Sequence, residues 1–166
     1  MAKRLLVICT LLCLDLFVFV LIYESNVEDS VKASTTFYEN VIALTFDDGP
    51  HGTYTKELLE GLKKREVVAS FFILGEHIEG NEELLLQMKE DGHLIGNHTF
   101  SHVKLDDLND QTACDEVRRT CEAIESITGE PVEYIRPPYG AYNEKLECMI
   151  NLNKVLWTID PQDWNT

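Results

Sequence analysis

Two adjacent carboxylates, Asp47 and Asp48, stand in the segment Thr-Phe-Asp-Asp-Gly-Pro at 45–50, directly after an apolar run. Unpaired charge at the end of a buried strand is strongly unfavourable, so such carboxylates are usually paired, protonated or bound to metal. The Gly-Pro step ends the strand and turns the chain, which could bring both carboxylates to one pocket. The pair predicts a divalent-metal site with a carboxylate base beside it; a solvated turn cap is the alternative.

Two histidines, His98 and His102, follow in His-Thr-Phe-Ser-His. In a helical turn their spacing of four places both imidazoles on one face, and the spacing is common in zinc sites. Together with one aspartate they would make a three-ligand site with an open position, which is typical of a catalytic metal. Such a metal lowers the pKa of a bound water and polarises a carbonyl.

Two later segments carry further candidates. Arg136 opens Arg-Pro-Pro-Tyr-Gly, where it could pair with Asp47, and the prolines stiffen a loop whose backbone N–H could serve as an oxyanion donor. Asp160-Pro-Gln-Asp163-Trp164 lies near the end of the sequence. Trp164 could form an apolar wall for a small acyl group, and ordinary packing is the alternative.

The elements that must position these residues alternate between strand and helix patterns. We expect strands at 41–46, 67–74, 94–96, 132–135 and 155–159, and helices at 54–65, 81–90, 106–128 and 143–152. Such alternation with short loops predicts an α/β fold with a parallel sheet, either open or closed into a barrel. In both cases the active site forms at the carboxyl ends of the strands, where the candidate residues stand.

The composition limits the partners. Hydrophobic residues make up 45% of the 166 residues, enough for a core, and the formal net charge is −15. This charge argues against nucleic acid and against binding to the surface of anionic lipid, so we expect a neutral or cationic substrate. We also expect a monomer.

The first forty residues predict a membrane attachment. Residues 1–4 form a basic cytoplasmic region, and the run 5–23 is interrupted only by Thr10 and Asp15. At about 1.5 Å per residue it spans roughly 28 Å, enough for a single-pass signal-anchor helix. Positive charge stays inside, which places the polar tether 24–40 and the domain 41–166 outside the cytoplasm. Secretion after removal of a signal peptide is the alternative.

Five cysteines are present, and none stands in a Cys-x-x-Cys motif that would indicate a zinc cluster or a redox site. Cys114 and Cys121 lie seven residues apart on one expected helix, about 10 Å along its axis, which is too far for a mutual disulfide. We expect buried free thiols; alternatively, Cys148 pairs with one of the two.

These motifs, in this order, resemble the polysaccharide deacetylase (NodB-homology) family, carbohydrate esterase family 4, over about residues 41–164. The family fold is a distorted (β/α) barrel, and its metal is usually zinc, with cobalt or another divalent ion possible. The resemblance implies deacetylation of an N-acetylated polysaccharide, most simply peptidoglycan N-acetylglucosamine; chitin oligomers and acetylxylan are alternatives. The same resemblance implies that Asp47 is the base, oriented by Arg136, and that Asp48, His98 and His102 are the metal ligands. It implies that Pro137 contacts the substrate and that the Tyr139 N–H donates to the oxyanion. It also implies that Asp163 tunes a catalytic histidine and that Trp164 forms a wall of the acyl pocket.

The family also has a general acid on a downstream Leu-x-x-His-like segment, and no match to it precedes Thr166. We therefore expect a barrel that is incomplete at its C-terminus, with lowered activity because loss of a proton-transfer group costs about 10²–10⁴-fold. The competing interpretation is a catalytically impaired remnant that serves as a metal-containing glycan-binding or structural domain.

Overall fold

The computed structural model describes residues 41–142, 146, 148 and 151–165. The expected anchor and tether lie outside these residues, as does most of the helix expected at 143–152. The chain divides into two units, 1–42 and 43–166, and the second contains the fold described below. No helix within the described residues is long and apolar enough to cross a membrane.

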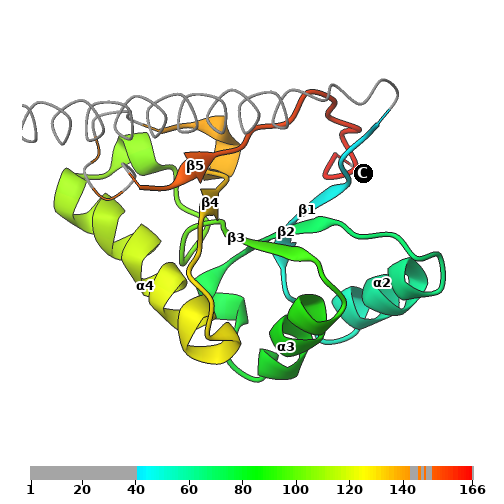
Figure 1. Cartoon of the computed structure of the whole chain (residues 1–166). Helices are drawn as coiled ribbons and strands as arrows, with labels where there is room; N and C mark the ends of the chain where they lie inside the picture. The colour runs from blue at the N-terminus through cyan, green and yellow to red at the C-terminus, as the bar shows by residue number, and fades with distance from the viewer. Residues whose placement is uncertain (1–40, 143–145, 147, 149–150, 166) are drawn as a thin grey trace, which may run out of the picture. The chain divides into compact units, whose positions relative to one another are not determined.

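The fold is a five-stranded parallel sheet in which the strands lie in chain order, β1-β2-β3-β4-β5 (Figure 1). Its strands are β1 (Thr45–Gly49), β2 (Ser70–Ile73), β3 (Leu94–Asn97), β4 (Tyr134–Ile135) and β5 (Asn153–Lys154). Its α-helices are α2 (Tyr54–Lys63), α3 (Glu82–Glu90) and α4 (Asp110–Thr128). Short 3₁₀ turns are η1 (Gly75–His77), η2 (Leu105–Asp107) and η3 (Pro138–Gly140).

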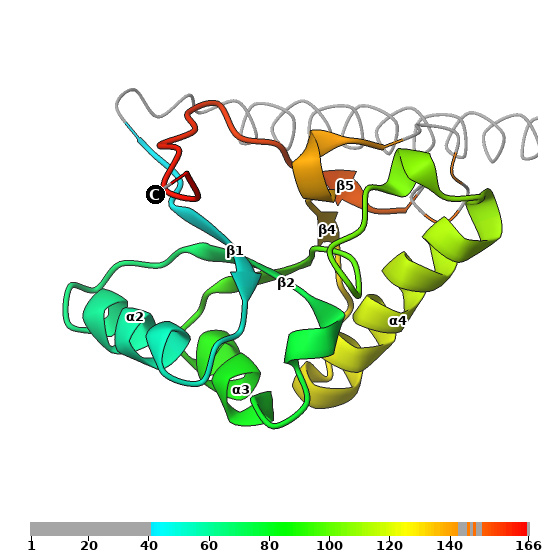
Figure 2. The ribbon, with the colours of Figure 1, turned by 180° about the vertical axis from the view of Figure 1, so that it is seen from behind.

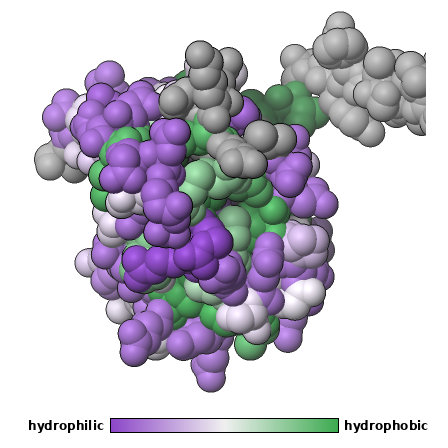
Figure 3. Space-filling view, turned by 90° about the vertical axis from the view of Figure 1, so that its left-hand side faces the viewer, coloured by the Kyte–Doolittle hydropathy of each residue, from purple (hydrophilic) through white to green (hydrophobic). Residues whose placement is uncertain are grey.

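Helices α2, α3 and α4 lie on one side of the strands, as Figures 1 and 2 both show. Their apolar positions recur at helical spacing, and Leu59 of α2 and Met88 of α3 are fully buried. On β2, Phe71 and Ile73 join this helix-facing core, while Phe72 is buried under the guanidinium of Arg136, 4.3 Å from the ring centre. Each such apolar side chain contributes about 1.5–3 kcal/mol through burial. Hydrophilic side chains cover much of the face in Figure 3, with apolar surface visible between them.

The long helix α4 begins later than its apolar pattern predicted. Asp110 is its first residue because Asn109 caps it, accepting a hydrogen bond from the Thr112 N–H at 3.0 Å. The residues before the cap form η2 instead. The helix ends, as expected, at Gly129, whose φ of 69° is the left-handed conformation that glycine adopts without strain.

Two strand predictions were wrong in position. The first strand does not begin at 41 but at Thr45, where pairing with Ser70 of β2 starts, and it continues through both aspartates to Gly49. The last strand is Asn153–Lys154, not 155–159, because these two residues are the ones in register with β4. The apolar side chains at 155–159, on which that prediction rested, are mostly exposed, among them Ile159 at 78%.

The cysteine prediction needs a correction as well. Cys114 and Cys148 form a disulfide with a Cα–Cα distance of 5.4 Å, so the alternative pairing holds and two of the thiols are not free. Cys121 is free, and burial raises the pKa of its thiol, which lowers the fraction present as the nucleophilic thiolate. The disulfide ties α4 to the segment between β4 and β5.

Candidate functional site

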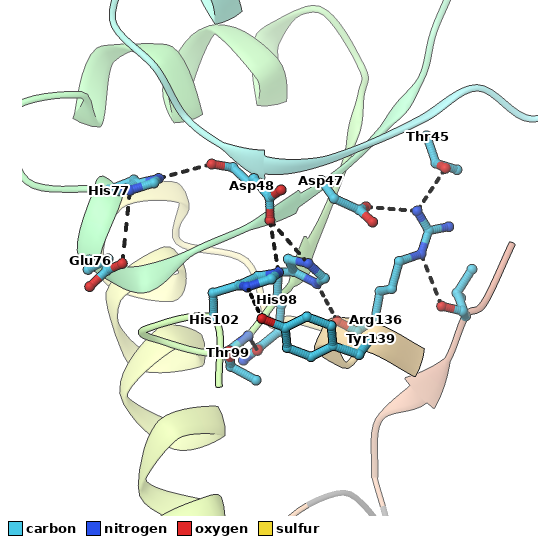
Figure 4. Close-up of polar contacts among 12 residues, drawn as sticks. Thr45, Asp47, Asp48, Glu76, His77, His98, Thr99, His102, Arg136 and Tyr139 are labelled. Atoms are coloured by element: carbon cyan, nitrogen blue, oxygen red, sulfur yellow. Dashed lines mark hydrogen bonds and ion pairs between the residues drawn. The ribbon is translucent and has the colours of Figure 1, made fainter. Parts of the chain in front are cut away.

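The two aspartates near the end of β1 stand where the strand is irregular, so both side chains point into one site (Figure 4). The register with β2 shifts between Phe46 and Gly49, and Asp48 has a φ of 66°, a left-handed conformation that is uncommon outside glycine. A regular strand would send neighbouring side chains to opposite faces of the sheet. The shift lets Asp48 reach two histidines while Asp47 meets an arginine, as Figure 4 shows.

Asp48, His98 and His102 form a compact group of three potential metal ligands. Asp48 Oδ1 lies 3.4 Å from His98 Nε2 and 3.3 Å from His102 Nε2, and the three ligand atoms lie within 4.8 Å of one another. Zinc bonds of about 2.0–2.1 Å at tetrahedral angles separate neighbouring ligand atoms by about 3.3–3.4 Å. The donor set of two imidazoles and one carboxylate also suits zinc, so these residues fit a single divalent ion.

The two imidazoles are oriented by contacts at their other ring nitrogen. His98 is 3% exposed, and its Nδ1 contacts the backbone carbonyl oxygen of Arg136. This places the proton on Nδ1 and leaves the Nε2 lone pair directed at Asp48, as a metal ligand requires. His102 is less enclosed; its Nδ1 lies 3.3 Å from the Tyr139 hydroxyl, and the two rings meet edge to face.

The protonation state of Asp48 also suits a ligand. The adjacent His98 side chain lowers the pKa of the Asp48 carboxyl below its usual value, against the opposing effect of partial burial. Metal ligands must be deprotonated, so the carboxylate is ready to bind.

Asp47, next to Asp48, is held by Arg136. The guanidinium Nη1 donates to Asp47 Oδ1 at 2.7 Å and to Thr45 Oγ1 at 2.8 Å, while Nε donates to the Val155 carbonyl at 3.2 Å. Arg136 is 3% exposed, whereas the Asp47 side chain is 28% exposed. A buried arginine therefore fixes a carboxylate that solvent can reach, the arrangement predicted for an oriented base.

The residues from 98 to 102, here called the ligand loop, do not form the helical turn that their spacing suggested. Thr99 and His102 have φ values of 68° and 54°, and the backbone carbonyls of the loop are tied to η1: Gly75 N donates to Thr99 O at 3.1 Å and Glu76 N to Phe100 O at 2.9 Å. Both imidazoles still face Asp48, but by way of an irregular loop.

Several supporting groups had no clear sequence signal. His77, the last residue of η1, has its Nδ1 2.9 Å from the backbone oxygen of Asp48. Asn97 is fully buried; its amide donates to the Val117 carbonyl at 2.8 Å and its Oδ1 accepts from Thr99 N at 2.7 Å. These contacts fix the backbone on both sides of the metal ligands.

The structure brings Arg136 and Tyr139 to the triad, the group formed by Asp48, His98 and His102. Pro137, which follows Arg136 in the sequence, is buried. The C-terminal candidates are placed differently. Trp164 is 73% exposed and donates its indole N–H to Asp160 Oδ1 at 3.4 Å within its own turn, where Asp163 is exposed too. The roles of Asp163, Trp164 and the Tyr139 N–H stay predictions.

Comparison with known proteins agrees with this arrangement. The sequence model described as polysaccharide deacetylase matches residues 34–154. Peptidoglycan-N-acetylmuramic acid deacetylase PdaC of Bacillus subtilis is 40% identical over 126 residues, covering 76% of this chain and 27% of that protein. Peptidoglycan-N-acetylglucosamine deacetylase of Bacillus cereus is 38% identical over 126 residues, covering 74% of this chain and 46% of that protein.

Solved structures match the fold as well. The PdaC structure aligns with a TM-score of 0.72 at 40% identity, covering 75% of this chain and 62% of that one. A family 4 carbohydrate esterase from Streptomyces lividans in complex with acetate aligns with a TM-score of 0.70 at 34% identity, covering 75% of this chain and 66% of that one. The expected fold class is confirmed, and the sheet in the described residues is not closed into a ring. The chain spans 27% and 46% of the two curated relatives named above.

Proposed function

The chain belongs to the polysaccharide deacetylase family, and on that premise we propose that it hydrolyses the acetamido group of an N-acetylated polysaccharide to acetate and a free amine. One observation carries this proposal. The triad of Asp48, His98 and His102 stands beside a second carboxylate, Asp47, that a buried Arg136 holds separately. A purely structural metal site would need no such oriented base.

The proposed substrate is peptidoglycan, deacetylated at its N-acetylglucosamine. The B. cereus relative is named for that sugar and PdaC for N-acetylmuramic acid, so both act on the same polymer. A neutral acetylated sugar also suits a chain with a net charge of −15. Chitin oligomers are the alternative, since a chitooligosaccharide deacetylase of Azorhizobium caulinodans is 35% identical over 136 residues. Acetylxylan is a further alternative substrate.

The residues divide the chemistry between them. A divalent ion bound by the triad, which we propose to be zinc, would supply a more acidic water and a polarised carbonyl. Asp47 takes the proton from the attacking water, with its Oδ1 fixed by Arg136 so that the carboxylate keeps one orientation. The Tyr139 backbone N–H, in a turn with a φ of 60°, donates to the developing oxyanion. Pro137 shapes the substrate side of this turn, and Trp164 and Asp163 keep their expected roles as acyl-pocket wall and histidine-tuning carboxylate.

A second candidate function is a metal-containing glycan-binding domain with little turnover. The exposure of Trp164, whose indole is bonded to Asp160 within its own turn, favours this candidate, because an acyl-pocket wall would lie against the substrate. The two functions differ in whether acetate is released.

The test measures acetate released from peptidoglycan and from N-acetylated chitooligosaccharides, with zinc or cobalt added. We expect chelation to abolish release, and Asp47→Asn to lower the rate about 10²–10⁴-fold while metal binding stays unchanged. Asp115→Asn, which removes a carboxylate on the outer surface of α4, is the matched control and should retain activity. Release no greater than that of Asp47→Asn would overturn the enzyme proposal and leave the glycan-binding one.

The released sugar identifies the substrate. Mass spectrometry of digested peptidoglycan after treatment would show glucosamine if the proposal is right. Muramic acid without its acetyl group would shift the assignment to the sugar for which PdaC is named.

We further propose that the domain acts outside the cytoplasm as a membrane-anchored monomer. The charge asymmetry around residues 5–23 supports the orientation, and the Cys114–Cys148 disulfide is typical of an oxidising compartment. The base, the arginine and all three ligands come from one chain, so no second copy is needed. Extraction of membranes with carbonate, which leaves spanning helices in place, tests the anchor. Sedimentation of the detergent-solubilised chain tests the monomer.

A further inference from the structure

The ligand loop is held by a carboxylate that lies outside every motif. Glu116, on α4, accepts three hydrogen bonds with its Oε2: from Phe100 N at 3.1 Å, from Ser101 N at 2.8 Å and from Ser101 Oγ at 3.0 Å. We propose that Glu116 is a positioning residue that holds the ligand loop in the shape that brings His102 to Asp48. The inference rests on the proposed function in that it takes the triad as the metal site.

The loop needs such a partner because its backbone is strained. Thr99 and His102 both adopt the left-handed conformation, which is uncommon outside glycine and strained for a β-branched threonine, so it persists only where surrounding contacts impose it. Phe100 and Ser101 lie between these two residues. Their successive N–H groups converge on one point, the concave arrangement that binds anions. Glu116 supplies that anion from within the protein.

Three other polar backbone groups of the loop have defined partners elsewhere. Asn97 Oδ1 accepts from Thr99 N, and the carbonyls of Thr99 and Phe100 accept from the backbone of η1. Without Glu116, two partly buried N–H groups would lose their acceptor while the strained residues on both sides stayed in place. Relaxation of the loop is then the favourable response.

The two histidines should respond differently. His98 is fixed independently of Glu116, since its backbone N–H donates to the Ile73 carbonyl at 2.9 Å and its ring contacts the Arg136 carbonyl. His102 stands at the far end of the loop and is 32% exposed. Loss of Glu116 should therefore release one ligand of three rather than the whole site.

The experiment titrates Co²⁺ into the full chain and follows its visible absorption, which reports the number and geometry of the ligands. Glu116→Ala should weaken Co²⁺ binding about 10–100-fold, the usual effect of losing a partner that orients a metal ligand, and should change the spectrum. Glu116→Gln keeps a carbonyl oxygen that can accept from the same N–H groups, so it should recover much of the affinity. A merely structural role would not alter the spectrum of the bound ion.

Two further variants complete the design. Glu122→Ala removes a different carboxylate from the same helix, one that pairs with the exposed Arg118. The Co²⁺ affinity of this variant should stay within about twofold of that of the unmodified chain. Ser101→Ala removes one donor to Glu116 Oε2 and should weaken binding less than Glu116→Ala. Its effect should shrink in the Glu116→Gln background, because the two side chains share one interaction.

The outcomes separate the inference from its premise. Unchanged affinity and spectrum in Glu116→Ala would overturn the positioning role while leaving the metal site intact. Failure of the unmodified chain to bind Co²⁺ would overturn the metal site and the inference with it. If circular dichroism shows that Glu116→Ala does not fold, Glu116→Gln and Ser101→Ala decide: additive or absent effects on affinity contradict the proposal, and the expected coupling supports it.

Discussion

The first three strands and the last two are held in different ways. β2 and β3 pair along four successive residue positions, and α2, α3 and α4 pack beside them over a continuous apolar core. In the described residues β3 and β4 meet at one pair, Asn97 with Ile135, and β4 and β5 have two residues each. The candidate metal ligands belong to the first region, whereas Arg136, Pro137 and Tyr139 belong to the second. Metal binding should therefore survive side-chain changes in the second region that disturb the geometry of the reaction but leave β4 in place.

The largest expected effect comes from breaking the first region at its centre. His98→Ala removes a buried ligand and should abolish stoichiometric zinc binding, a greater loss than the 10–100-fold typical of partners behind a ligand. Elemental analysis after dialysis measures the metal content. An unchanged ratio of zinc to protein would contradict the ligand assignment.

The second region should depend on the Cys114–Cys148 disulfide for its stability. Replacing both Cys114 and Cys148 by alanine opens a connection of 34 residues and should lower the free energy of unfolding by about 3–4 kcal/mol. Denaturant unfolding measures the change. If the comparison is right, the folded variant binds zinc with nearly unchanged affinity; a matching loss of metal would show that the two regions are not separable.

A smaller effect is expected where the ligand loop packs on η1. A Cβ added at Gly75 would overlap Phe100 Cδ2 and lie 2.7 Å from Thr120 Oγ1. Gly75→Ala should therefore cost about 1–3 kcal/mol of stability and weaken metal binding, because Phe100 is part of the loop.

Gly61 provides the matched control for that substitution. It lies within α2, where the nearest atom to an added Cβ is an arginine side-chain nitrogen at 3.5 Å. Gly61→Ala should stabilise the protein by about 0.5–1 kcal/mol. Equal effects of the two substitutions in urea unfolding would refute the packing argument.

The smallest effect tests the contact across the two regions. Tyr139→Phe removes the hydroxyl that meets His102 Nδ1 at 3.3 Å, and a single neutral hydrogen bond contributes about 0.5–1.5 kcal/mol. Zinc affinity should fall no more than about tenfold, while the backbone N–H of residue 139 remains. Isothermal titration gives the affinity, and a complete loss of binding would make Tyr139 part of the metal site itself.

The residues alone predicted that two histidines and one aspartate would meet, and the family resemblance chose Asp48 rather than Asp47 as the third ligand. A carboxylate after one strand and a histidine pair after another must meet if the strands are parallel, whatever the exact backbone. The same reasoning explains why Arg136, which follows β4, lies at the same edge of the sheet. What it could not supply was the irregular backbone: the register shift in β1 and the left-handed Thr99 and His102 depend on partners from other elements.

Supporting residues were missed for a related reason. Glu116 is one of several acids on a highly charged helix, and its pattern is that of a solvated face. His77 and Asn97 likewise belong to no recognisable motif. The strand misplaced at 155–159 shows the converse error, since β-branched and aromatic side chains there indicate burial that the described structure does not provide.

Arg136 contributes to the site twice, through chemically independent atoms. Its backbone carbonyl orients His98, and its side chain holds Asp47. A substitution at 136 can remove only the second function, so it should separate a fall in turnover from metal retention. A displacement of β4 moves both atoms together and should make turnover and metal content decline in parallel. Plotted against each other for a set of variants, these two quantities would distinguish damage to a side chain from movement of a strand.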